Sequence, residues 1–176
     1  MLREATAESE ARLAINDRLD VALAVGAGGV HLAGQSLPVA EAVRVAAGRL
    51  LVGRSVHDLE EARRAADDGA DYLTFGHVFP TQSHPGVPPR GLAQLAEIVE
   101  AVQVPVLAIG GISSANLDQV LATGCAGIAV ISAVLADAHP QAAAARLRQA
   151  LDTSRHRPRR PFHASHHAGI AHAAHR

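Results

Sequence analysis

The residue most suited to acid/base chemistry in this sequence is His77, in the stretch GHVFPTQSHPG (76–86). It follows a short apolar run, so it stands where a strand gives way to a loop. An imidazole changes its charge near neutral pH and can accept and return a proton in one reaction. The alternative is a polar residue that ends a strand for structural reasons. On these residues alone, both interpretations stay open.

A second group of residues suits a phosphate. Gly110 and Gly111 end the run PVLAIGG (105–111), and Ser132 ends the run GIAVIS (127–132). Glycines let a ligand approach the backbone, whose N–H groups donate hydrogen bonds together with the serine hydroxyl. The glycine pair also suits a tight turn, but a hydroxyl at the next strand end favours the phosphate site.

Both groups lie at the ends of predicted strands, in a chain that alternates short apolar runs with longer amphipathic ones. Strands are expected at 13–17, 29–33, 50–56, 72–78, 105–111 and 127–132, and helices at 18–27, 38–48, 58–70, 91–102, 113–125 and 139–151. Strict βα alternation predicts a parallel sheet with the helices outside it. Such a sheet is either open and doubly wound or closed as a barrel.

Polar residues gather at the C-terminal ends of these strands, where both architectures bind ligands. They are Asn16, Asp17, Arg54, Ser55, His77, Gly110, Gly111 and Ser132. The phosphate pattern on the last two strands favours an α/β fold of the (β/α)8 TIM-barrel type. Only six βα units are counted, so we expect a barrel truncated at its N-terminal side, without its first two strands. The two exposed sheet edges favour self-association as a homo-oligomer.

Composition excludes several classes of protein. About half of the 176 residues are apolar but only 2% are aromatic, which predicts one domain with an aliphatic core. The net charge is −1 and the chain has no lysine, so nothing indicates a nucleic-acid surface. The single Cys125 cannot form an internal disulfide. No run suits a membrane span or a secretory signal, so we expect a cytoplasmic protein.

The end of the sequence differs from the rest. We expect the barrel domain to span 1–151 and the Arg- and His-rich stretch 152–176 to be a disordered tail. The tail holds six histidines, which could bind a metal weakly. Their spacing does not resemble that of a structural zinc site, which favours a solvated tail.

Three ordered stretches resemble one family of enzymes. They are AINDRLDVALAVGAGGVHLAGQSLP, VGRSVHDLEEARRAADDGADYLTFGHVFPT and PVLAIGGISSANLDQVLATGCAGIAVISAV. From about Leu2 to Leu151 the chain is similar to the thiamine-phosphate synthase and thiazole tautomerase superfamily. That resemblance implies a (β/α)8 barrel and leaves two activities to choose between.

The synthase branch joins a pyrimidine pyrophosphate to a thiazole phosphate and needs Mg²⁺. The resemblance implies that Asp17 would be one magnesium ligand, but Ser36 stands where a second Asp is expected. In FPTQSH, Ser83 and His84 stand at the Thr and Lys positions of the synthase loop. Losing a carboxylate weakens Mg²⁺ binding, and losing the Lys removes a fixed positive charge. Both departures favour the tautomerase branch.

The expected function is therefore a thiazole tautomerase, which isomerises a carboxythiazole phosphate to its aromatic form without a cofactor or a metal. The resemblance implies that His77 is the acid/base and that Gly110, Gly111, Ile131 and Ser132 hold the phosphate of the small-molecule substrate. Ser55, Thr81 and Ser83 would position the ring or its carboxylate, and Asn16 would add a polar contact. The alternatives are thiamine-phosphate synthase, with Mg²⁺ on Asp17, or a non-catalytic regulatory protein that binds a phosphate ligand.

Three other histidines have structural explanations at this stage. His57 either caps the helix expected from Asp58 or joins the site. We expect His31 to be a satisfied core residue and His84 to be solvated in its Pro/Gly loop.

Overall fold

The computed structural model describes residues 2–7 and 9–162. Its helices are α1 (Leu2–Ala7), α2 (Leu19–Ala24), α3 (Val39–Ala46), α4 (Leu59–Asp67), α5 (Gly91–Ala101), α6 (Leu117–Leu121), α7 (Ser132–Leu135) and α8 (Pro140–Asp152). Its strands are β1 (Ala14–Asn16), β2 (Gly29–Leu32), β3 (Leu51–Val56), β4 (Tyr72–Gly76), β5 (Val106–Ile109) and β6 (Gly127–Ala129). Within these residues, no helix is long and apolar enough to cross a membrane.

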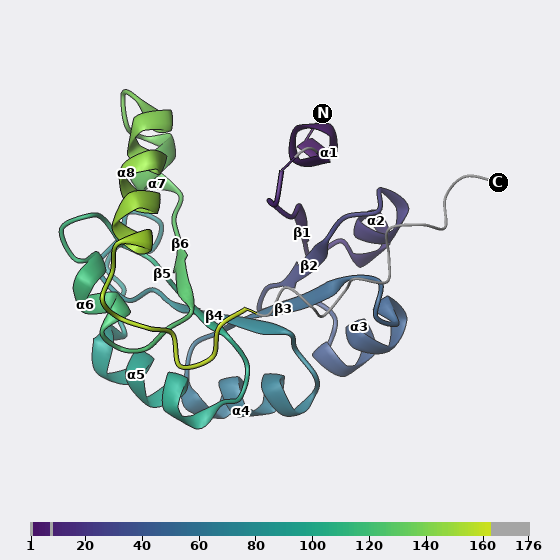
Figure 1. Ribbon diagram of the computed structural model, residues 1–176. Helices are drawn as coiled ribbons and strands as arrows, with labels where there is room; N and C mark the ends of the chain where they lie inside the picture. The colour runs from purple at the N-terminus through teal and green to yellow at the C-terminus, as the bar shows by residue number, and fades with distance from the viewer. Residues whose placement is uncertain (1, 8, 163–176) are drawn as a thin grey trace.

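The strands form one parallel sheet in chain order, β1 to β6. The sheet curls, and helices α3 to α6 lie along its outer, convex side (Figure 1). A doubly wound sheet would carry helices on both faces. The curled sheet with helices outside therefore confirms the expected TIM-barrel type and its six βα units.

Alternation along the strands separates the core from the concave face. Val30 and Leu32 of β2 are fully buried, as are Leu73 and Phe75 of β4, because these side chains point toward the helices. Their burial supplies about 25 cal/mol for each Å² of apolar surface removed from water. The residues between them, such as His31 and Thr74, therefore face the concave side, where they can reach a ligand.

The last two βα units differ from the expected boundaries. The helix expected over 113–125 is only α6, because Asn116 folds the preceding stretch into a turn. Its side chain accepts from the Ser113 N–H at 2.9 Å and donates to the Gly111 carbonyl at 2.9 Å. The strand expected to reach Ser132 ends at Ala129, and that serine instead begins α7.

The first part of the stretch expected to be disordered is ordered in the structure. After α8, residues 153–162 form a segment, the strap, that contacts the body of the protein. The Arg159 N–H donates to the Gly124 carbonyl at 2.8 Å, the Arg160 guanidinium donates to Gln103, and the Phe162 ring lies 5.7 Å from that of Tyr72. Disorder is therefore not what the structure shows for 153–162, while the rest of the tail, 163–176, lies outside the described residues.

Candidate active site at the C-terminal ends of the strands

One cavity of about 200 Å³ opens at the C-terminal ends of β3 to β6. Most of the predicted site residues line it together: Ser55, His77, Thr81, Ser83, Gly110, Gly111, Ile131 and Ser132. Thr74, His57 and His84 also line it. The structure therefore brings the predicted acid/base and the predicted phosphate residues to one pocket, at the end of the sheet where a barrel binds its substrate.

His77 is buried in the wall of this pocket, with only 7% of its surface exposed. Its Nε2 lies 3.2 Å from the Val87 carbonyl, and its ring stacks on that of His84 at a centroid distance of 4.8 Å and an interplanar angle of 10°. An Nε2–H that donates to Val87 leaves Nδ1 as the acceptor of the neutral ring. The imidazole is thus held in one orientation from two sides.

The backbone packing requires glycine at positions 110 and 111, whether or not they contact a ligand. Both have positive φ, 95° and 67°. A Cβ at Gly110 would lie 2.3 Å from the His77 Cβ, and one at Gly111 would lie 2.5 Å from the Pro80 carbonyl oxygen. The end of β5 therefore passes directly under the segment that follows β4. The glycines keep these backbones close and leave the space above them free for a ligand.

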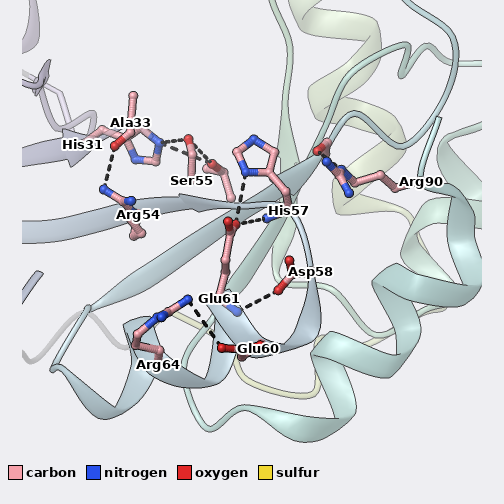
Figure 2. Close-up of polar contacts among 12 residues, drawn as sticks. His31, Ala33, Arg54, Ser55, His57, Asp58, Glu60, Glu61, Arg64 and Arg90 are labelled. Carbon is pink, nitrogen blue, oxygen red and sulfur yellow. Dashed lines mark hydrogen bonds and ion pairs between the residues drawn. The ribbon is translucent and has the colours of Figure 1, made fainter. Parts of the chain in front are cut away.

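A polar cluster on the concave face forms the floor beside the pocket. His31 Nε2 lies 2.9 Å from the Ser55 hydroxyl, whose oxygen lies 3.1 Å from that of Thr74. On the other side of the ring, His31 Nδ1 lies 3.2 Å from the Tyr72 hydroxyl. Burial lowers the pKa of His31, so its neutral form is favoured. This confirms the expectation that His31 is satisfied, and it fixes the Ser55 hydroxyl at the pocket edge (Figure 2).

His57 lies beside the N-cap of α4, which is Asp58. Its backbone N–H and its Nδ1 approach Glu61 Oε2 at 2.7 and 3.1 Å, while the Asp58 side chain accepts from the Glu61 N–H (Figure 2). The start of α4 is thereby capped in both directions. His57 also lines the pocket. Among the contacts described, Glu61 is its charged partner.

The predicted magnesium position lies apart from this cavity, at the end of β1. Asp17 accepts hydrogen bonds from the Ser36 hydroxyl, from the Ala33 N–H at 2.9 Å and from the Asn16 amide at 2.8 Å. The hydrogen bond from Ser36, followed by that from Ala33, lowers the pKa of Asp17. Asn16 therefore orients a carboxylate and does not line the pocket, in contrast to the role expected for it.

His84 is the residue of the site that sequence reasoning missed. It was expected to be solvated, and its side chain is indeed exposed, but it stacks on His77 and lines the cavity. The loop from Thr81 to Arg90 has no regular spacing of apolar residues, so its conformation could not be predicted from the sequence. The available signal was its place in FPTQSH, at the position where the resemblance implies a lysine.

Known proteins match this chain over most of its length. The family model for thiamine monophosphate synthase matches residues 1–134. The thiamine-phosphate synthases of Anaeromyxobacter dehalogenans and Methanoculleus marisnigri are 49% and 48% identical, over 86% and 84% of this chain and 68% and 70% of their own length. The solved thiamine phosphate pyrophosphorylase from Pyrococcus furiosus is 46% identical with a TM-score of 0.79, over 86% of this chain and 72% of that structure.

These relatives overturn the expected tautomerase. Proteins that share nearly half of their residues with this chain are named thiamine-phosphate synthases, so the isomerase interpretation is wrong. It rested on Ser36 and His84, and on the match of His77 to the acid/base of the tautomerase. Ser36 donates to Asp17, and His84 packs against His77 in the pocket. Ser36 therefore lies with Asp17 apart from the pocket, whereas His84 lines it.

Proposed function

Because this chain belongs to the thiamine monophosphate synthase family, we propose that it is a thiamine-phosphate synthase. It joins a pyrimidine pyrophosphate to a thiazole phosphate and releases pyrophosphate. The observation that carries the proposal is the similarity to synthases at 46 to 49% identity over more than four-fifths of the chain. The pocket at the strand ends supports it, because Gly110, Gly111 and Ser132, the residues expected to hold a phosphate, line it together.

The reaction forms one bond and breaks another. The thiazole nitrogen bonds to the methylene carbon of the pyrimidine, while the bond from that carbon to oxygen breaks and its electron pair leaves with the pyrophosphate. The protein must hold two anionic substrates with their reactive ends together, which converts an encounter in solution into a step within one complex. Placement of the two anions is therefore the main task of the residues around the pocket.

Different residues around the pocket place the different parts of the substrates. The backbone at Gly110 and Gly111 and the hydroxyl of Ser132 receive the thiazole phosphate, which brings the ring over Ser55 and Thr74. The His31 cluster holds those hydroxyls in place from below. The coupling moves no proton to or from carbon, so His77 acts as a fixed wall of the pocket and not as an acid/base.

The residues at the end of β1 fit a magnesium ion that is held largely by its substrate. Mg²⁺ usually keeps several waters and binds through one or two carboxylates together with substrate phosphates. Asp17 supplies one such carboxylate, kept ionised by its hydrogen bonds from Ser36 and Ala33. Among residues 2–7 and 9–162, no group of three or more His, Cys, Asp or Glu side chains is placed to hold a metal ion, so an all-protein cage is not available there. When bound, the ion would offset the charge of the leaving pyrophosphate.

A product assay tests the proposal. The chain is incubated with both substrates and Mg²⁺, and thiamine phosphate is separated by chromatography. We expect product only when both substrates are present, and a higher KM for thiazole phosphate in Ser132→Ala. Ser114→Ala is the matched control, because this exposed serine lies outside the pocket. Binding of both substrates without any product would instead support the non-catalytic regulatory alternative.

A further inference from the structure

A chain of ring contacts leads from the strap to the pocket. The strap runs from α8 to β4, where the Phe162 ring lies 5.7 Å from the Tyr72 ring (Figure 1). The Tyr72 ring lies 5.6 Å from the His31 ring at an interplanar angle of 26°, and His31 reaches Ser55 at the pocket edge. These contacts connect the strap, at the N-terminal ends of the strands, with the ligand site at their C-terminal ends.

The sheet and the strap hold Tyr72 from different sides. Its ring lies across Gly53 of the neighbouring strand β3, where an added Cβ would come within 2.1 Å of the ring. The strap is anchored by hydrogen bonds to the loops that precede β5 and β6, and it brings Phe162 against the same ring. Tyr72 is therefore confined to one orientation, in which its hydroxyl lies 3.2 Å from His31 Nδ1.

The Tyr72 hydroxyl is suited to donate in this contact. Burial, followed by the charge of Asp71, raises the pKa of Tyr72, so the phenol keeps its proton. A neutral imidazole has one donor nitrogen and one acceptor nitrogen. The acceptor nitrogen binds a hydroxyl hydrogen more readily than a phenol oxygen binds an imidazole N–H. A hydroxyl that donates to His31 Nδ1 leaves the hydrogen of the neutral ring on Nε2.

The position of that hydrogen determines what the pocket floor can donate. His31 Nε2, the Ser55 hydroxyl and the Thr74 hydroxyl form a triangle with sides of 2.9, 3.1 and 3.2 Å. If Nε2 is bare, one hydroxyl donates to it and the other donates to the first, so both hydroxyl hydrogens are used within the triangle. If Nε2 carries the hydrogen, it donates to Ser55, one bond joins the two hydroxyls, and one hydroxyl hydrogen remains for an acceptor in the pocket.

We propose that Tyr72, held by the strap, is a positioning residue of the pocket: by donating to His31 Nδ1, it leaves Ser55 and Thr74 with one hydroxyl hydrogen for the ligand. The inference rests on the proposed function for the identity of that ligand, but not for the arrangement of hydrogens. The strap lies beyond residue 134, where the match to the family model ends. A segment outside that match therefore supports the floor of the pocket.

The ring nitrogen signals of His31 give a test that needs no substrate. The full chain is labelled with isotopically enriched histidine, and NMR spectra are recorded at about pH 8, where the ring is neutral. The His31 signals are identified by their absence from His31→Gln. We expect the hydrogen on Nε2 in the unaltered chain and a mixture of both tautomers in Tyr72→Phe, which keeps the ring and loses the hydroxyl. Phe162→Ala should shift the signals in the same direction, whereas Arg155→Ala, at an exposed position of the strap, should leave them unchanged.

Several results of this experiment would overturn the proposal. They are a hydrogen on Nδ1 in the unaltered chain, His31 signals that do not change in Tyr72→Phe, and His31 signals that do not change in Phe162→Ala. A change of all histidine signals together in Tyr72→Phe would also overturn it, because Tyr72 would then support the whole fold and not one ring.

A second arm measures the affinity for thiazole phosphate. Tyr72→Phe should bind it about three- to tenfold more weakly, which is the usual effect of one lost hydrogen bond. In the His31→Gln background the same change should have no further effect, because Tyr72 acts through His31. Additive effects would contradict this route. An absence of binding by the unaltered chain would instead count against the proposed function, while the tautomer of His31 still decides the inference.

Discussion

At the residue scale, the shape of the pocket depends on places where no side chain is tolerated. Gly76, Gly110 and Gly111 each lie where an added Cβ would come within 2.5 Å of backbone or side-chain atoms of the neighbouring segment. Burial and a contact with the Val87 carbonyl then fix the imidazole of His77 beside them. The chemistry of the site follows from the close approach of the ends of β4 and β5.

Gly110→Ala tests this close approach. The new methyl group would collide with His77, and the positive φ of this position adds strain, so we expect a loss of about 2–4 kcal/mol in the free energy of unfolding. Urea denaturation measures it. Gly34→Ala is the control, because nothing lies within 4 Å of its added Cβ, and it should change stability little. Equal stability of the two variants would contradict the packing described for the pocket.

His31 makes the stability of the fold depend on pH. Burial lowers its pKa below the ordinary value of 6.5, so the unfolded chain takes up a proton near that pH while the folded chain does not. Protonation thus favours unfolding, and stability present above about pH 6.5 is lost as the pH falls below it. Chemical denaturation at a series of pH values should show a smaller acid loss in His31→Gln. An unchanged pH profile would mean that His31 titrates alike in both states.

Histidines also show what a sequence can reveal about single residues. The place of His77 directly after an apolar run was sufficient to predict that it lies at a strand end, and the structure places it in the pocket lining. His84 lies seven positions later in an irregular loop, and only the folded path of that loop stacks the two rings. For Asn16 the same signal misled. Its place at a strand end predicted a ligand contact, but its amide donates to the neighbouring Asp17.

At the scale of elements, hydrophobic alternation and caps predicted the order of strands and helices, whereas side-chain hydrogen bonds determined where several of them end. Asn116 delays α6, and the early end of β6 at Ala129 makes Ser132 the first residue of α7. The strap could not be predicted because its contacts, such as Arg160 with Gln103, join residues that are distant in the sequence. Composition alone indicated a tail.

The cap of α4 connects an element to the site. Asp58 accepts from the Glu61 N–H at 2.8 Å, and Glu61 in turn accepts from the His57 N–H. Asp58→Ala should therefore destabilise the protein by about 1 kcal/mol, as measured by thermal or urea unfolding. Asp67→Ala, at the other end of the same helix, removes a charge without a cap and is expected to be close to neutral. Equal losses in both variants would indicate that the capping contact contributes nothing.

At the scale of the whole molecule, the sheet places the pocket and the proposed magnesium ligand on different strands. The cavity lies over β3 to β6, and the carboxylate of Asp17 lies at the end of β1, the first strand of the order. Within the described residues, β1 and β6 each have a sheet neighbour on one side only. Self-association through these edges remains a prediction, which sedimentation analysis can check by measuring the mass of the species in solution.

The central claim is that this pocket serves a transfer between two anionic substrates. The most direct test is the steady-state release of pyrophosphate from the pyrimidine substrate, followed with and without thiazole phosphate. We predict release only in the presence of thiazole phosphate, with one thiamine phosphate formed for each pyrophosphate. Release that does not depend on thiazole phosphate, or no release when both substrates are bound, would contradict the claim.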